Sequence, residues 1–147
     1  RVTQVYIDYL EARARGGVGL MYTEATYVDP RGKGRGLQMG LYDDDLIPQL
    51  RKMVHAVQKH GARIGPELNF GGRVVHPEVS GFESWAPSVV PYAGAAPFVP
   101  HAMSVADIRN VATSFASPAC PPRASSFPPP SLALSRNRPP TAGAPTR

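Results

Sequence analysis

The strongest constraint on the fold is an order that occurs twice along the chain: a helical pattern, a glycine, and a short apolar run that leads to a glutamate. In the first occurrence, Thr3 is placed to cap a helix that ends at Gly16–Gly17. The run 18–23 then predicts a strand, with Glu24 at its end. Short apolar runs that follow helices in this way are typical of strands buried in parallel sheets. The first occurrence therefore predicts one helix–strand unit of an α/β fold.

The second occurrence carries stronger helix signals. Asp43–Asp45 place negative charge at the start of the helix, where the macrodipole favours it. Pro48 falls in the first turn, where a proline is tolerated. Residues 59–61, Lys-His-Gly, form a conventional helix stop. A second parallel strand is therefore expected directly after this stop.

The second strand lies in residues 63–73, RIGPELNFGGR, which carry Glu67 and then break into a glycine pair followed by Arg73. The glycines let the backbone approach a ligand closely, and the arginine offers a fork for an anion. Pro66 is expected to remove a ladder hydrogen bond and to distort the strand locally. Since the carboxyl ends of parallel strands meet at one edge, we expect Glu24 and Glu67 at the edge where α/β enzymes place their chemistry.

The rest of the chain departs from this order. A long loop, residues 74–104, leads to Ser104, which is placed to cap a helix that stops at Ser117. Residues 117–147 hold nine of the 17 prolines, four arginines and no acidic residue, so most of the formal charge of +5 belongs to them. Such a segment cannot bury enough apolar surface to offset its ordering entropy, and we expect it to be disordered.

Composition and spacing exclude several kinds of site. Cys120 is the single cysteine, so neither a disulfide framework nor a metal site built from cysteines is expected. His55 and His60 are five residues apart, about 140° around a helix, and cannot share a metal ion. No apolar run reaches membrane-spanning length, and the near-neutral charge of residues 1–116 argues against a nucleic-acid partner. We expect a cytoplasmic protein.

Two patterns allow more than one interpretation. The loop 31–36, Arg-Gly-Lys-Gly-Arg-Gly, suggests a phosphate cradle or an RNA-binding run. It lacks the Walker pattern and interleaved aromatic residues, so a solvated loop is the favoured interpretation. Glu24 and Glu67 could form an acid–base pair, although carboxylates at strand ends more often cap helices or pair with arginine.

Five spaced motifs occur in the order of a known family. They are residues 9–20 (YLEARARGGVGL), 23–25 (TEA), 40–44 (GLYDD), 68–73 (LNFGGR) and 85–88 (WAPS). With these motifs, residues 1–116 resemble the Old Yellow Enzyme family of FMN-dependent oxidoreductases, in the branch that includes bacterial 2,4-dienoyl-CoA reductases. The resemblance implies an α/β fold, an incomplete (β/α)8 TIM barrel of two to three βα units. We therefore expect a partial flavin-binding barrel over residues 1–116 and a Pro-rich disordered tail over residues 117–147.

The resemblance also implies three cofactor-binding residues. Ala25 matches a position whose backbone lies against the flavin. Glu67 stands where the family has a glutamine whose amide pairs with the pyrimidine edge of the flavin, and Arg73 keeps the family's arginine. Phe70 stands where a histidine is usual. The resemblance assigns no catalytic residue and no metal ligand.

The implied function is that of an FMN-dependent NAD(P)H oxidoreductase of the ene-reductase type. Its reduced flavin would pass a hydride to an activated alkene, a small molecule. We expect this chain to be inactive alone, because two strands cannot close a barrel and their open edges favour self-association or a partner chain. The alternatives are a fragment of another phosphate-binding TIM-barrel enzyme and a non-catalytic basic binding module.

Overall fold

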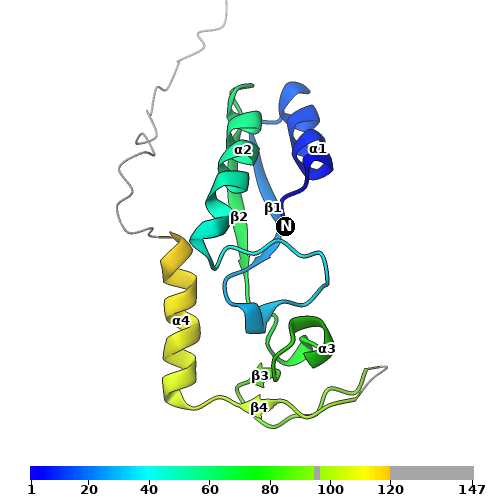
Figure 1. Ribbon diagram of the computed structural model, residues 1–147, viewed down its shortest axis with the longest axis vertical. Helices are drawn as coiled ribbons and strands as arrows, with labels where there is room; N and C mark the ends of the chain where they lie inside the picture. Colours follow the sequence, from blue (N-terminus) through cyan, green and yellow to red (C-terminus); the bar gives the residue numbers. More distant parts are fainter. Residues whose placement is uncertain (95–96, 120–147) are drawn as a thin grey trace, which may run out of the picture.

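Two parallel strands, each preceded by a helix, form one half of the computed structural model, which describes residues 1–94 and 97–119 (Figure 1). The order is α1 (Gln4–Arg15), β1 (Leu20–Tyr27), α2 (Ile47–Gln58) and β2 (Arg63–Asn69). The strands pair in parallel, from Leu20 opposite Arg63 to Tyr27 opposite Asn69. This arrangement confirms the α/β class and the parallel pairing that the repeated order predicts.

Helix α1 begins and ends where the sequence signals place it, whereas α2 begins at Ile47, after the acidic run Asp43–Asp45, which belongs to a short 3-10 helix (Asp44–Leu46) and its cap. The Thr3 hydroxyl accepts a hydrogen bond from the backbone N–H of Tyr6 at 3.2 Å, and Pro48 lies in the first turn of α2. Gly61, with φ of 82°, follows the end of α2. The helices and β1 enclose the core, which consists of Val2, Ile7, Leu10, Ala14, Met21, Met39, Met53, Ala56, Val57 and Ala62.

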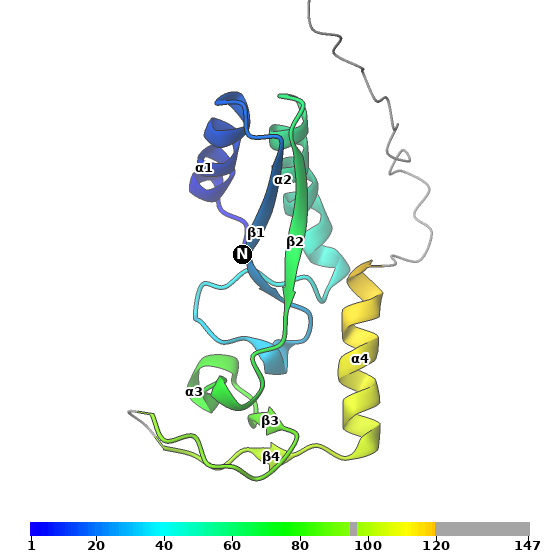
Figure 2. The same ribbon diagram turned by 180° about the vertical axis from the view of Figure 1, so that it is seen from behind.

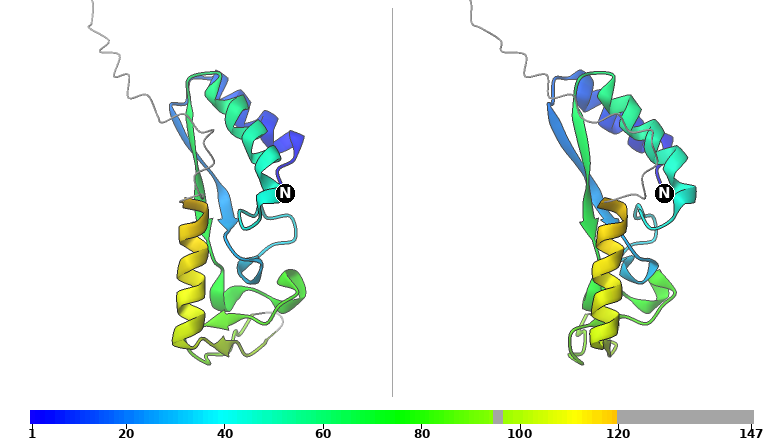
Figure 3. Two further views of the ribbon diagram at one scale, coloured as in Figure 1. Left: turned by 60° about the vertical axis from the view of Figure 1, so that its left-hand side comes forward. Right: turned by 90° about the vertical axis from the view of Figure 1, so that its left-hand side faces the viewer.

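The first strand differs from its prediction at both ends. It begins at Leu20 rather than at residue 18 and ends at Tyr27, so Glu24 lies inside the strand. Leu20 and Tyr22 are exposed while Met21 is buried, because α1 and α2 cover only one side of the strand pair (Figure 3). The sequence predicts a strand that is buried on both faces. In the described part of the chain, only the face of β1 toward α1 and α2 is buried.

A bulge interrupts the pairing of the strands opposite Pro66. Tyr22 faces Gly65 and Ala25 faces Glu67, so two residues of β1 lie opposite the single proline. The Thr23 hydroxyl fills the gap: it accepts a hydrogen bond from the Glu67 N–H at 3.3 Å. The predicted local distortion is therefore present at this position.

Pro66 removes no hydrogen bond from the β1–β2 ladder, contrary to the expectation from the sequence. Arg63 and Glu67 direct their N–H groups at β1, to the Gly19 carbonyl and the Thr23 hydroxyl respectively. Alternation along the strand therefore places the Pro66 nitrogen on the outer edge of β2. The proline removes a donor from the side that a further strand would use, and it costs the β1–β2 ladder nothing.

The outer edge of β1 is covered over its carboxyl half by other parts of the chain. The Glu24 N–H donates to the Tyr6 hydroxyl at 2.8 Å. The loop after β1 turns back beside the strand, as Figure 2 shows in light blue and cyan. There the Tyr27 N–H donates to the Met39 carbonyl at 3.0 Å, and the Leu41 N–H donates to the Tyr27 carbonyl at 2.9 Å.

Residues 74–104, which were expected to form a loop, contain short regular elements. They are α3 (Pro77–Ser80), β3 (Trp85–Ala86) and β4 (His101–Ala102), and the two strands pair in parallel. Among the described residues, three short 3-10 helices complete the connections: η1 (Pro30–Gly32), η2 (Asp44–Leu46) and η3 (Gly72–Val74). The carboxyl ends of β1 and β2 point toward this part of the molecule (Figure 1).

The last described helix, α4 (Val105–Ala119), stands apart from α1 and α2 (Figure 3). Ser104 caps it as predicted: its hydroxyl accepts from the Asp107 N–H at 3.2 Å. The helix continues through Ser117, which was expected to end it. The predicted disorder of residues 117–147 falls almost wholly outside the described residues. In the part that is described, no helix is long and apolar enough to cross a membrane.

Candidate functional site

Ala25 and Glu67 lie opposite each other on the two parallel strands, two residues before the strands end. Ala25 is half-buried and Glu67 is exposed. Within residues 1–94 and 97–119, the Glu67 carboxylate forms no hydrogen bond or ion pair. The structure thus brings together two of the three predicted cofactor-binding residues, with one carboxylate left available to a ligand.

Glu24 does not join this pair. Its Oε1 accepts a hydrogen bond from the Met39 N–H at 3.1 Å, so the carboxylate holds the returning loop. No hydrogen bond among the described residues connects it to Glu67. The two glutamates therefore do not form the acid–base pair that the sequence left open.

Arg73 lies beyond the strand, in η3, and its side chain is exposed. Between it and Glu67 the chain packs closely on η1: the Gly71 N–H donates to the Gly32 carbonyl at 3.1 Å. A Cβ atom added at Gly32 would lie 2.7 Å from a ring carbon of Phe70. Phe70, at the usual histidine position, is therefore half-buried against the loop, and Arg73 lies six residues after Glu67, beyond the end of β2.

A single glutamine joins the loop to this pair. The Gln38 side chain is buried and its Nε2 donates to the Ala25 carbonyl at 2.8 Å. Its Oε1 accepts from the N–H groups of Gly34 and Arg35 at 2.7 and 3.2 Å. The Arg-Gly run is therefore not wholly a solvated loop, because Gly32 is buried and residues 34–35 are tied down by this amide.

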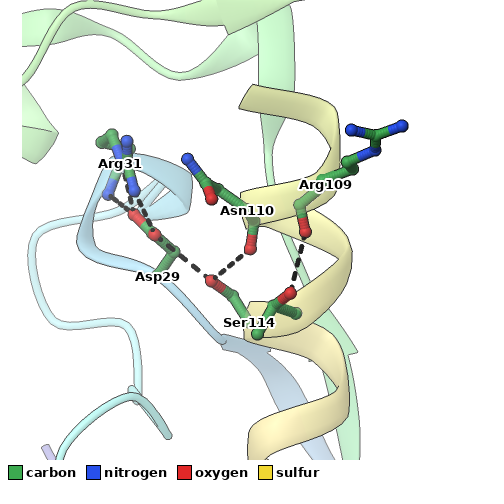
Figure 4. A network of polar contacts seen from close by, with 6 residues as sticks. Asp29, Arg31, Arg109, Asn110 and Ser114 are labelled. Atoms are coloured by element: carbon green, nitrogen blue, oxygen red, sulfur yellow. Dashed lines mark hydrogen bonds and ion pairs between the residues drawn. The ribbon is translucent and has the colours of Figure 1, made fainter. Parts of the chain in front are cut away.

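A second polar network joins the start of η1 to α4 (Figure 4). The buried Asp29 carboxylate accepts from Nε and Nη2 of Arg31 at 2.9 and 2.7 Å and from the Arg31 N–H at 2.9 Å. Ser114 of α4 donates to the same carboxylate at 3.4 Å. The Arg31 guanidinium lies 3.9 Å from the centre of the Trp85 ring, within cation–π range.

Charge on Asp29 is maintained by this network. Burial favours the neutral carboxyl, but the hydrogen bonds from Arg31 outweigh burial and hold the pKa of Asp29 below its usual value. The same pair raises the pKa of Arg31. The network is an internal ion pair between Asp29 and Arg31. Through Ser114 and Trp85 it holds the start of η1, α4 and β3 together.

A cleft of about 250 Å³ lies beside the network. It is lined by Val28, Leu41, Tyr42, Thr113, Ser114 and Ser117. None of the predicted cofactor-binding residues lines it. We therefore take the strand edge at Ala25 and Glu67 as the candidate site, because it presents an exposed carboxylate, which the lining of the cleft lacks.

An ion-pair cluster on Glu11 ties the ends of α1 and α2 together. His60 lies 3.3 Å from the Glu11 carboxylate, which also pairs with Lys59 at 2.8 Å and ties α1 to α2. Among the described residues, no group of three His, Cys, Asp or Glu side chains could hold a metal ion.

Sequence reasoning missed both Gln38 and the Asp29 network. Asp29 precedes Pro30, a usual pattern for a helix start, and its carboxylate does accept from the Arg31 N–H at the start of η1. That local signal was available in the sequence. Gln38 carries no such signal, because its partners in the fold lie both inside the loop and on a strand 13 residues earlier.

Comparisons with known proteins agree over most of the chain. Residues 1–126 match the model of the NADH:flavin oxidoreductase / NADH oxidase family. An NADPH dehydrogenase of Geobacillus thermodenitrificans is 42% identical over 104 residues, which are 71% of this chain and 29% of that protein. An NADH oxidase of Thermoanaerobacter brockii is 41% identical over 92 residues, 61% of this chain and 14% of that protein. The chain thus spans less than a third of the length of either relative.

Solved structures give the same fold. The Old Yellow Enzyme homologue from Zymomonas mobilis superposes with a TM-score of 0.70 at 24% identity, covering 80% of this chain and 35% of that one. Histamine dehydrogenase from Rhizobium superposes with a TM-score of 0.71 at 27% identity, covering 77% of this chain and 18% of that one. The described residues therefore correspond to part of each larger structure.

Proposed function

Because the chain belongs to the NADH:flavin oxidoreductase / NADH oxidase family, we propose that it forms one wall of the flavin site of an FMN-dependent ene-reductase. Membership of this family confirms the resemblance seen in the motifs and a flavin as the family's cofactor. The names of the relatives, NADPH dehydrogenase and NADH oxidase, support NADH or NADPH as the reductant. A small activated alkene is the proposed substrate, and the proposed flavin-binding part is residues 1–116.

The observation that carries the proposal is the pairing of Ala25 with Glu67 near the carboxyl ends of two parallel strands. In parallel α/β folds, cofactors lie at this end of the sheet. Ala25 is small and half-buried, so its backbone can lie against a flat ring. Glu67 is exposed and its carboxylate is unengaged among the described residues, so it can accept a hydrogen bond from a ring N–H.

The fit to FMN is good with one mismatch. When bound, FMN supplies hydride chemistry that no side chain can supply. An ionised glutamate only accepts hydrogen bonds, whereas the pyrimidine edge of the flavin offers both donors and acceptors. Glu67 therefore satisfies the ring N–H and leaves the neighbouring oxygen without a donor. Arg73 is the proposed cation beside the ring.

The test is a titration of the purified full chain with FMN, followed by flavin fluorescence and visible absorption. We expect saturable binding but no alkene reduction with NADH or NADPH, because the described strands form only part of a flavin site. Riboflavin and inorganic phosphate serve as competitors. Competition by phosphate but not by riboflavin would favour a different phosphate-binding barrel, and absence of FMN binding would overturn the proposal.

A further inference from the structure

Gln38 holds the backbone on which the proposed flavin site depends. It is one of the few buried polar residues in the described part of the chain, with 8% of its surface exposed. Its side-chain amide contacts three backbone groups: the Ala25 carbonyl at 2.8 Å, the Gly34 N–H at 2.7 Å and the Arg35 N–H at 3.2 Å. One side chain therefore couples a strand to the tip of a loop.

The three partners fix the orientation of the amide. Gly34 and Arg35 each present a donor, and Ala25 presents an acceptor. With the amide turned over, its NH2 group would face two N–H donors and its oxygen would face a carbonyl. Only the observed orientation satisfies all three groups.

The position of the loop tip depends strongly on this amide. Residues 34–37 are exposed, and Leu37 is 91% exposed. Among the described residues, one backbone–backbone hydrogen bond also involves this tip. The Gln38 N–H donates to the Arg35 carbonyl at 3.2 Å, so this bond does not connect the tip to β1. The bonds from the Gln38 amide are therefore what connect the tip to β1.

The Ala25 carbonyl depends on the same group. It points to the outer edge of β1, away from β2, because a bulge separates it from the regular part of the ladder. Its hydrogen-bond donor is a side chain and not the backbone of another strand. Removing that donor would free the carbonyl to turn toward water.

We propose that Gln38 is a positioning residue for the flavin site, which fixes the Ala25 peptide against the face of the ring and holds the Gly34–Arg35 turn beside it. The inference rests on the proposed function, because it is the flavin that would lie on Ala25. Gln38 itself does not contact the ring in this proposal. It acts through the backbone of Ala25.

Two substitutions distinguish the bond from Gln38 to the Ala25 carbonyl from the bonds that Gln38 accepts from Gly34 and Arg35. Gln38→Glu keeps the shape and the oxygen that accepts from Gly34 and Arg35, but its ionised carboxylate has no donor for the Ala25 carbonyl. Gln38→Met fills the same space and makes none of the three bonds. Gln58→Glu is the matched control, because it makes the same chemical change at an exposed position at the end of α2.

Each full-length variant is titrated with FMN, and amide hydrogen exchange is measured at residues 34 and 35. We expect Gln38→Glu to raise the FMN dissociation constant by at least about fivefold, because it loses one hydrogen bond and turns a negative oxygen toward the Ala25 carbonyl, while exchange at these amides stays slow. Gln38→Met should show both weaker binding and fast exchange, and Gln58→Glu should show neither.

These measurements distinguish a failure of the proposed function from a failure of the inference about Gln38. If the unmodified chain binds no FMN, the proposed function fails and this inference fails with it. If the unmodified chain binds FMN and the Gln38 variants bind it equally well, only the inference is overturned. Weaker binding by Gln38→Glu together with fast exchange throughout β1 and α2 would also overturn it, because that pattern marks general destabilisation.

Discussion

Replacing Asp29 by asparagine is expected to destabilise the chain by about 2 kcal/mol at pH 7. The carboxylate accepts three hydrogen bonds from Arg31, at 2.7 to 2.9 Å, and a longer one from Ser114. Asparagine keeps one oxygen and turns an NH2 group toward the guanidinium. Each hydrogen bond to a charged group contributes about 1.5–3 kcal/mol. The total is smaller than their sum, because the Arg31 side chain is 29% exposed and water replaces part of the loss.

The assay is urea unfolding of the wild type, Asp29→Asn, Arg31→Met and the double variant. Trp85 is the single tryptophan and lies under the Arg31 guanidinium, so its fluorescence reports on the network directly. The wavelength of its emission should change in Asp29→Asn before any unfolding. The two substitutions should be less than additive, since they remove the same ion pair.

The pH dependence provides an independent check. The pKa of Asp29 is lowered in the folded chain, so its stabilising effect is present above about pH 4 and is lost as the pH falls through the lowered value. The difference between wild type and Asp29→Asn should therefore shrink as the solution becomes acidic. Free energies of unfolding within about 0.5 kcal/mol of each other at pH 7, with unchanged Trp85 emission, would refute the reasoning.

Three further predictions concern single positions. Gly32→Ala should destabilise the chain by about 1–3 kcal/mol in urea unfolding, because its Cβ would lie 3.0 Å from the Phe70 Cα, whereas Gly36→Ala meets open space and should have little effect. Burial raises the pKa of Tyr27 to about 12, so stability that depends on its neutral hydroxyl is present below about pH 10 and lost as the pH rises toward 12. Tyr27→Phe should remove that alkaline loss, and a loss that persisted would point to another group. Glu67→Gln should strengthen FMN binding by about 1–3 kcal/mol in a graft of this chain onto the Geobacillus relative, and equal affinity would mean that residue 67 does not face the flavin.

Features encoded by neighbouring residues were predictable from the sequence. The caps at Thr3 and Ser104, the proline in the first turn of α2 and the glycine after it depend on contacts within a few residues. The parallel pairing followed because two helix–strand units in succession leave few other arrangements.

Features that depend on distant contacts were not predictable. The bounds of β1 and its burial on two faces were both predicted wrongly. The packing of α1 and α2 decides which face of the strand is buried, and that packing is not visible in the local sequence. The bulge opposite Pro66 is held by Thr23, whose partner Glu67 is 44 residues away. Ser114 reaches Asp29 across 85 residues, a separation at which one sequence gives no local signal.

The covered outer edge of β1 has a consequence for aggregation. Strands associate with foreign chains through free backbone donors and acceptors. On β1, Tyr6, Gln38 and the segment 39–41 occupy those groups from Glu24 onward, which leaves a free stretch only at residues 20–23 of the described strand. On the opposite edge, Pro66 interrupts β2 with a residue that cannot donate. An intruding strand would therefore find only short ladders on either side, a natural protection against amyloid-like growth even while two exposed apolar side chains, Leu20 and Tyr22, remain in water.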